Sequence, residues 1–324
     1  LNPSGPSRSG LQPAMTDSLL QPRPCVPIAY SEHFVLPLPP GHRFPMAKYA
    51  ELPRRLLGAG LVKSDWFFSN PTMKTERVLR VHSADYVQRL QQQLLTRQEV
   101  RKIGFPLSSA LIKREFMLAE ATWQCALKAL KHDMSFNIAG GTHHAFTDHG
   151  EGFCLLNDIA IAAANLRAEN KAQRILIVDL DVHQGNGTAE IFQNTPEVFT
   201  FSMHGAKNYP VQKQNSDLDI ALPPETDDSA YLQQLQQHLP AVLDAFHPDF
   251  VFYLAGVDVL GSDKLGKLQL TLHGCQQRDS FVYQQLKMRQ LPVVTVMGGG
   301  YSPELNTVVT AHMNTFRAGL SVYA

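Results

Sequence analysis

The chain has 324 residues, of which 44% are hydrophobic and 18% charged, and its 29 basic residues balance its 29 acidic residues. Zero net charge disfavours binding to nucleic acid or a membrane surface through bulk electrostatics. No apolar run approaches the ~20 residues that a membrane-spanning helix needs. The four cysteines are far apart and form no Cys-x-x-Cys pair, which favours reduced thiols and a cytoplasmic protein.

The first part of the chain differs in composition from the rest. Residues 1–14 are rich in Pro, Gly and Ser and lack hydrophobic periodicity. We therefore predict a disordered leader or a cloning remnant over residues 1–24, and one catalytic domain over residues 25–324.

From residue 25 onward, short apolar runs alternate with longer amphipathic segments. Near-continuous apolar runs are typical of strands buried on both faces of a parallel sheet. The segments between them carry apolar residues at helical spacing or are rich in alanine, and the last begins with a Ser cap at Ser229. The predicted strands are 26–31, 134–141, 174–181, 198–203, 250–258 and 292–300, and the predicted helices are 108–131, 156–170 and 229–246.

The alternation of strands and helices predicts the fold class. We expect an α/β protein with a single doubly wound domain around a mainly parallel central sheet. The segment 205–228 is long, polar and contains prolines, so we expect it to cross the surface beside the active site. In such a sheet, ligands bind beyond the carboxyl ends of the strands.

Two strand ends carry candidate metal ligands. In "DLDVHQGNG", period-two alternation predicts that Asp179, Asp181 and His183 lie on one face, so that Asp181 and His183 hold a metal ion and Asp179 orients a neighbour. The strand ending in "LAGVD" adds Asp258. Two aspartates and one histidine form a three-ligand set with open positions, as a catalytic zinc site requires. Hydrogen-bonded strand ends or helix caps would explain each motif by itself.

Three further strand ends carry groups suited to catalysis. His143 and His144 in "AGGTHHAF" could exchange protons near neutral pH, although they could also be surface histidines. Tyr301 after three glycines could donate a hydrogen bond to an oxyanion, or could simply be packed. Gly152 and Phe153 in "HGEGFCLLND" could form one wall of a narrow channel, with a core phenylalanine as the alternative.

Taken in chain order, the five motifs "AGGTHHAF", "GEGFCLLND", "DLDVHQGNG", "LAGVD" and "GGGY" resemble the zinc-dependent histone deacetylase family over about residues 25 to 320. The stretch "GHRFPMAKY" (41–49) and Asn186 in "DLDVHQGNG" look most like the class IV branch, as found in bacteria. The resemblance implies an arginase/deacetylase-like fold with its active site at the carboxyl ends of the strands. It also implies removal of acetyl or long-chain fatty acyl groups from lysine side chains of proteins or peptides.

The resemblance also implies roles for individual residues. Asp181, His183 and Asp258 match the zinc ligands, Tyr301 matches the tyrosine that polarises the acyl carbonyl, and His144 matches the general base and acid beside His143. The matched substrate-binding residues are Gly152, Phe153, Tyr209 and Leu265 around the acyl-lysine tunnel, with Arg43 in the internal cavity beyond the zinc. The matched ligands of a structural potassium ion are Asp179, Asp181, His183, Ser202 and Met203. Hydroxamate-type inhibitors are expected to bind.

Three positions depart from the family pattern. Asn186 stands where many relatives have an aspartate behind the second histidine, which lowers the expected basicity of His144 and leaves open which histidine is the base. Thr142 stands where many relatives carry a large aromatic residue, which could admit longer acyl chains. We find no match for the rim aspartate that grips the substrate backbone in other classes.

Other functions remain as alternatives at this point. An acetylpolyamine deacetylase would need a narrower, acid-lined mouth for a small cationic substrate. A manganese ureohydrolase of the arginase type would need carboxylates that bridge two metal ions, and a binding module would keep the pocket without turnover. The sequence leaves open the oligomeric state, the physiological substrate and whether zinc or iron occupies the site.

Overall fold

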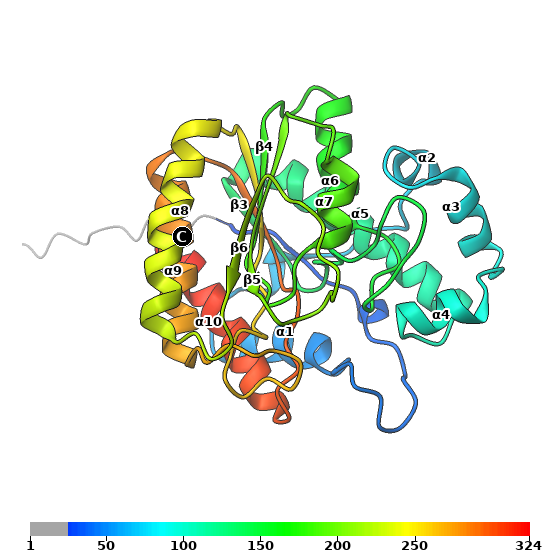
Figure 1. Cartoon of the computed structure of the whole chain (residues 1–324), viewed down its shortest axis with the longest axis horizontal. Helices are drawn as coiled ribbons and strands as arrows, with labels where there is room; N and C mark the ends of the chain where they lie inside the picture. The colour runs from blue at the N-terminus through cyan, green and yellow to red at the C-terminus, as the bar shows by residue number, and fades with distance from the viewer. Residues whose placement is uncertain (1–24) are drawn as a thin grey trace, which may run out of the picture.

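The computed structural model describes residues 25–324, so the leader predicted over residues 1–24 lies outside the described residues. A parallel sheet of eight strands runs through the centre, in the order β2-β1-β3-β8-β7-β4-β5-β6 (Figure 1). The predicted α/β fold with a doubly wound parallel sheet is confirmed. The strands are β1 (Ile28–Ala29), β2 (Phe67–Phe68), β3 (Met134–Asn137), β4 (Ile175–Asp179), β5 (Val198–Gly205), β6 (Leu218–Leu222), β7 (Phe250–Leu254) and β8 (Val293–Val296).

Helices cover both faces of the sheet (Figure 1). One layer contains α5, α6 and α7, and the other contains α8, α9, α10 and α1, with contacts between neighbours in each layer. No helix in the range 25–324 is both long and apolar enough to cross a membrane. The helices are α1 (Lys48–Gly58), α2 (Thr75–Val78), α3 (Ala84–Gln91), α4 (Arg97–Ile103), α5 (Ser109–His132), α6 (Asp158–Ala168), α7 (Asn186–Phe192), α8 (Asp228–Phe246), α9 (Leu272–Met288) and α10 (Leu305–Tyr323).

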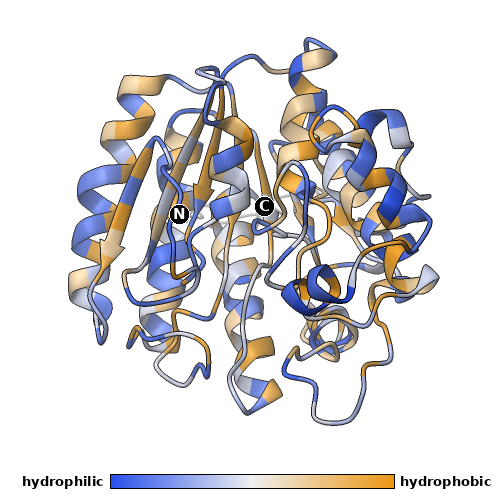
Figure 2. Cartoon of the chain, turned by 45° about the vertical axis from the view of Figure 1, so that its right-hand side comes forward, coloured by the Kyte–Doolittle hydropathy of each residue, from blue (hydrophilic) through white to orange (hydrophobic). Residues whose placement is uncertain are grey.

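The core lies on both faces of the central strands. Every residue of β3, β4, β7 and β8 is buried, and Figure 2 shows hydrophobic colours along the strands and hydrophilic colours on the outer sides of the helices. On one face, Phe136 of β3 stacks on Phe316 of α10 with ring centroids 4.0 Å apart. Burial on both faces fixes the strands rigidly, so the positions of their carboxyl ends are also fixed.

The sequence placed several strand ends too late. The runs predicted as 134–141, 174–181 and 292–300 leave the sheet after Asn137, Asp179 and Val296. These runs stay apolar or glycine-rich beyond the sheet because the chain there lines a buried site. The predicted strand 26–31 is observed as the two-residue strand β1, because only Ile28 and Ala29 pair with neighbouring strands.

The two edge strands, β2 and β6, were not predicted from the sequence. The segment 205–228, expected to be a surface connection, contains β6, which pairs with β5 from Leu218 to Leu222. Its residues are mostly only partly buried, because an edge strand has one neighbour. Its sequence therefore lacks the apolar run by which the central strands were recognised.

The topology marks one place in the sheet as a ligand site. Strands β4 and β7 are neighbours, but the chain leaves β4 toward β5 and leaves β7 toward β8, in opposite directions. A crevice opens at the carboxyl ends of strands where the connections diverge in this way. The segments that follow β4 and β7 are the ones that carry the candidate metal ligands.

The N-cap residue of helix α8 differs from the one that the sequence predicted. The sequence predicted a cap at Ser229, but Asp227 is the N-cap residue, because its Oδ1 accepts a hydrogen bond from the Ala230 N–H at 2.9 Å. We predict that Asp227→Ala lowers the free energy of unfolding by about 1 kcal/mol, measured by urea denaturation. Ser229→Ala is the matched control and should leave it within about 0.5 kcal/mol. Equal losses in both variants would contradict the assignment of the cap.

Candidate active site

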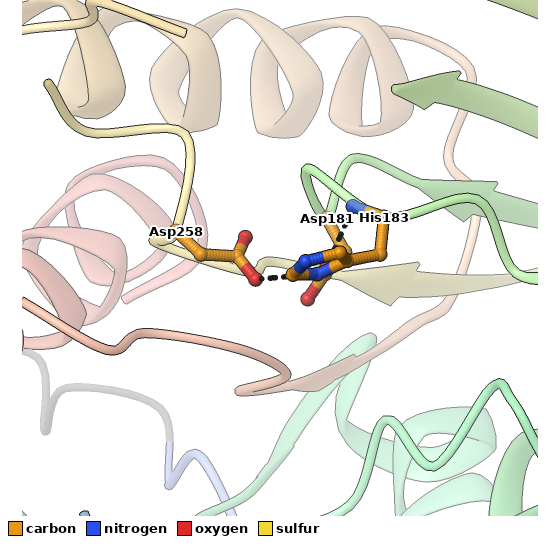
Figure 3. Close-up of side chains that lie close together, drawn as sticks. All are labelled: Asp181, His183 and Asp258. Carbon is orange, nitrogen blue, oxygen red and sulfur yellow. Dashed lines mark hydrogen bonds and ion pairs between the residues drawn. The ribbon is translucent and has the colours of Figure 1, made fainter. Parts of the chain in front are cut away.

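Asp181 and His183 follow β4 and Asp258 follows β7, and their side chains lie close together beyond the carboxyl ends of these strands (Figure 3). One ligand atom from each lies within 4.8 Å of the others, and all three residues are buried. The imidazole Nδ1 of His183 is 3.0 Å from Asp181 Oδ1 and 3.1 Å from Asp258 Oδ2. Two carboxylates and one imidazole therefore converge on one small volume.

The backbone after β4 places two of these side chains. The strand ends at Asp179, so the prediction that Asp181 and His183 lie on the same extended strand was wrong. Instead, Asp179 Oδ1 accepts a hydrogen bond from the Asp181 N–H at 3.1 Å, and Asp181 Oδ1 accepts one from the His183 N–H at 3.0 Å. Two successive side-chain-to-backbone turns give the alternation that the strand was expected to give.

The charge of this cluster suits a cation. Burial lowers the pKa of the His183 imidazole, but the two neighbouring carboxylates outweigh burial and raise that pKa to about 10. Asp258 Oδ1 accepts a hydrogen bond from the Val182 N–H, whereas the buried Oδ2 has the 3.1 Å ion-pair contact with His183 but accepts no hydrogen bond of good geometry from the described residues. Nitrogen and carboxylate donors with an oxygen left unsatisfied fit a divalent transition metal such as zinc.

Two glycine-rich segments allow the backbone to approach the cluster closely. The Gly299 N–H donates to Asp181 Oδ2 at 2.8 Å. A Cβ atom at Gly299 would clash with Asp258 Oδ2, and a Cβ atom at Gly256 would clash with Asp181 Oδ2. Glycine is therefore required at positions 256 and 299 because a side chain there would clash with the carboxylates of the cluster.

His143 and His144 lie beside the cluster, with ring centroids 4.1 Å apart. Gly140 and Gly141 have φ values of +81°, which turn the chain so that both rings line the same cavity. Asp158 holds this turn, since its carboxylate accepts hydrogen bonds from the Gly141 N–H at 3.0 Å and the Thr142 N–H at 2.8 Å. The structure thus brings together the two adjacent histidines that the sequence singled out.

The two histidines differ in their partners. His143 Nδ1 is 2.7 Å from Asp179 Oδ2, and His144 Nδ1 is 2.6 Å from Asn186 Oδ1. Burial lowers the pKa of His143, but the Asp179 carboxylate outweighs it and the net shift is upward. Burial lowers the pKa of His144 well below its ordinary value, and the Asn186 amide only weakly opposes this. Their environments favour a protonated His143 and a neutral His144.

Tyr301 lines the same cavity as the histidine pair, Asp181 and His183. Its backbone N–H donates to Asp263 Oδ2 at 2.6 Å, and Asp263 Oδ1 accepts from the Leu265 N–H at 2.8 Å. Burial raises the pKa of the Tyr301 phenol far above its usual range, and the Asp181 carboxylate adds to this shift. The phenol therefore keeps its proton and can donate a hydrogen bond.

An open pocket of about 250 Å³ leads from the surface to His144, His183 and Tyr301. Gly152, Phe153, Tyr209 and Leu265 line it, as the resemblance implied. Tyr209 is 40% exposed, and its ring meets that of His144 edge to face. The remaining lining residues include three basic side chains, Arg43, Arg101 and Lys102.

Beyond the cluster lies an inner cavity of about 40 Å³. The prediction that Arg43 lines this cavity was wrong, because Arg43 is exposed at the outer pocket. The buried Arg114 of α5 reaches the inner cavity instead. Sequence reasoning assigned Arg43 by its place in a motif, whereas the contact of α5 with the cavity depends on how that helix packs.

The residues implied for potassium are near each other. Asp179 of β4 pairs in register with Ser202 of β5, and Met203 follows it in the same strand. Ser202 Oγ is 3.0 Å from His204 Nδ1.

Several residues that shape the site were missed by sequence reasoning. Asp158 and Asp263 hold loops through their carboxylates. The buried Lys48 donates to the Gly298 carbonyl at 2.8 Å, and burial lowers its pKa to about 8. Glu151 accepts a hydrogen bond from Asn186 Nδ2 at 2.7 Å. Single charged residues in loops and helices carry little signal, although Glu151 lies within the quoted "HGEGF" motif.

Fold and site together define an α/β protein with two histidines and a buried Asp/His/Asp cluster that could hold a metal ion, at a topological switch point. The model of the histone deacetylase domain matches residues 42–316, and the chain belongs to this family.

Individual relatives agree with this assignment. The chain is 44% identical, over 92% of its length and 99% of the relative's, to an uncharacterized protein of Picosynechococcus sp.. It is 26% identical to Histone deacetylase 2 of Arabidopsis thaliana, over 86% of this chain and 75% of that one. The crystal structure of an HDAC homolog from Aquifex aeolicus has the same fold, with a TM-score of 0.78, 24% identity, and coverage of 91% of this chain and 84% of that chain.

The glycine that borders the cluster gives a test of the metal site. We predict that Gly299→Ala abolishes stabilisation by divalent metal, because its methyl group would clash with Asp258 Oδ2. A metal at about 100 times its dissociation constant should stabilise the wild type by roughly 2.7 kcal/mol, visible as a higher unfolding temperature.

The matched control is Gly58→Ala, since a Cβ atom there has no neighbour within 4 Å. This variant should respond to metal as the wild type does. A wild-type chain whose unfolding temperature is insensitive to Zn²⁺, Fe²⁺ and Mn²⁺ would contradict the metal site.

Proposed function

We propose that this protein is a zinc-dependent hydrolase that removes acyl groups from lysine side chains of proteins or peptides. The observation that carries the proposal is the convergence of Asp181, His183 and Asp258 beside a histidine pair and Tyr301, at the inner end of the open pocket. A zinc ion held by these three ligands would polarise the acyl oxygen and acidify a bound water. Membership of the histone deacetylase family supports the same reaction class.

The chain's own groups have distinct roles in this proposal. His144 is neutral and takes the proton from the attacking water, then returns it to the departing lysine amine. His143, held by Asp179, supplies positive charge beside it. The Tyr301 hydroxyl donates a hydrogen bond to the acyl oxygen as negative charge develops. Phe153 and Tyr209 line the path of the lysine side chain.

The inner cavity favours a short acyl group. Its volume of about 40 Å³ is small beside the volume of about 250 Å³ of the outer pocket. Thr142 does not enlarge this cavity, because its hydroxyl group donates a hydrogen bond to Asp158 Oδ1 at 2.6 Å. We therefore propose acetyl-lysine as the preferred substrate and long-chain acyl-lysine as the second candidate.

The charge at the outer pocket argues against a polyamine substrate. Arg43, Arg101 and Lys102 line this pocket, and no acidic residue is among its lining residues within the described part of the chain. An acetylpolyamine carries further ammonium groups, which these side chains would repel. The acid-lined mouth that the polyamine alternative needs is therefore replaced by a basic one.

The remaining elements of the proposal concern the number of metal ions, the location and the inhibitors. An arginase-type two-metal site is disfavoured because, among the described residues, the one cluster with metal-ligand geometry is Asp181, His183 and Asp258. Potassium near Asp179, Ser202 and Met203 stays a proposal, as does the class IV assignment. All four cysteines are unpaired, which supports a cytoplasmic location. Binding of hydroxamate-type inhibitors is supported by the structure of an HDAC homolog complexed with SAHA.

Tyr301→Phe tests the proposed mechanism. We expect kcat on an acetyl-lysine peptide to fall on the order of 10²-fold, the scale for losing one donor to a developing oxyanion. Phenylalanine preserves the ring packing against Phe44, so zinc content should be unchanged. Undiminished turnover would remove Tyr301 from the mechanism.

A substrate series tests the proposed specificity. On one lysine peptide carrying acyl groups from acetyl to myristoyl, we expect kcat/KM to be highest for acetyl, and N-acetylspermidine to be poorer than the acetyl peptide by about tenfold or more. The double variant Arg43→Glu with Arg101→Glu should reduce the difference in kcat/KM between the acetyl peptide and N-acetylspermidine. Arg54→Glu, a charge reversal in another pocket, should not. A preference for myristoyl or for acetylspermidine would overturn the corresponding part of the proposal.

A further inference from the structure

A chain of buried hydrogen bonds continues past His144. His144 Nδ1 contacts Asn186 Oδ1 at 2.6 Å, and Asn186 Nδ2 donates to Glu151 Oε1 at 2.7 Å. The exposed fractions are 5% for His144, 2% for Asn186 and 8% for Glu151. His144 and Glu151 lie in the connection between β3 and α6, and Asn186 is the first residue of α7. The three side chains are thus linked inside the protein, where hydrogen bonds are strong and an unmade one is costly.

The chemistry of the two ends decides how the middle residue must point. A carboxylate can only accept hydrogen bonds, so Asn186 must turn its NH₂ group toward Glu151. Its amide oxygen then faces His144 and can only accept, so His144 must carry its proton on Nδ1. The other ring nitrogen, Nε2, is left with a free lone pair.

An asparagine alone would not impose this state. Rotation of its amide by half a turn would present NH₂ to His144 Nδ1 and place the proton on Nε2, where the ring could no longer act as a base. An aspartate needs no such control, because both of its oxygens accept. In this protein the carboxylate of Glu151 fixes the orientation of the Asn186 amide. The other oxygen of this carboxylate, Oε2, lies 3.7 Å from Lys102 Nζ at the outer pocket.

We propose that Glu151 is a positioning residue that fixes the amide of Asn186 and, through it, the tautomer of His144. Glu151 and Asn186 together perform the task that a single aspartate would perform at position 186. The kinetic consequence rests on the proposed deacylase function, whereas the tautomer itself does not.

The test uses Glu151→Met, which removes the acceptor while keeping a long, unbranched side chain. We expect kcat on an acetyl-lysine peptide to fall on the order of tenfold, the scale for losing an outer hydrogen-bond partner, with KM little changed. Adding Asn186→Asp to Glu151→Met should restore most of kcat, because an aspartate needs no partner to present an oxygen. Glu151→Gln keeps an acceptor and should retain most of the wild-type kcat.

Two controls separate this role from others. Glu190→Gln removes a nearby carboxylate that binds Thr147 and should leave kcat unchanged. Lys102→Met removes the ion pair with Glu151 at the pocket and should change KM more than kcat. If Glu151 acted only through stability or through Lys102, Asn186→Asp would give no rescue, and that result would overturn the proposal.

Nitrogen-15 NMR of the histidine side chains, with His144 assigned from His144→Gln, gives a readout that needs no turnover. We expect an Nδ1-protonated His144 in the wild type and in the double variant, and a mixture of tautomers in Glu151→Met. An unchanged tautomer in Glu151→Met would refute the role of Glu151. A wild-type chain without hydrolytic activity but with the expected tautomers would instead refute only the proposed function.

Discussion

The structure depends on the burial of two carboxylates, Asp181 and Asp258, against one imidazole at the carboxyl ends of β4 and β7. Charges are costly to bury unless they are paired or bound to metal. The backbone N–H groups of Val182 and Gly299 donate hydrogen bonds to these carboxylates and partly stabilise their buried charge. The cluster is therefore a candidate site for a cation, and glycines surround it because the backbone must come this close.

The polar groups around the cluster are each held by a partner one step further out. Asp158 fixes the turn that carries the histidines, and Asp263 fixes the backbone of Tyr301. Asp179 supports His143, and Asn186 with Glu151 supports His144. Such outer contacts set ring orientation and proton position, which a site built on loops cannot set by backbone geometry alone.

The same arrangement separates the two adjacent histidines. Both rings are buried in one cavity, yet one faces a carboxylate and the other an amide. The charged partner favours the imidazolium and the neutral partner favours the free base. A single loop thereby carries, side by side, one imidazole whose surroundings favour a positive charge and one whose surroundings favour the free base.

The sequence by itself determined the parallel α/β fold and predicted that Asp181, His183 and Asp258 would meet, because central strands are recognisable as apolar runs and their carboxyl ends share one edge. It could not determine where those strands end, nor the edge strand β6, which is only half covered. Nor could it place Arg43 outside and Arg114 inside, or join Glu151 to Asn186. Those facts depend on contacts between segments far apart in the chain, and only tertiary packing decides which of them meet.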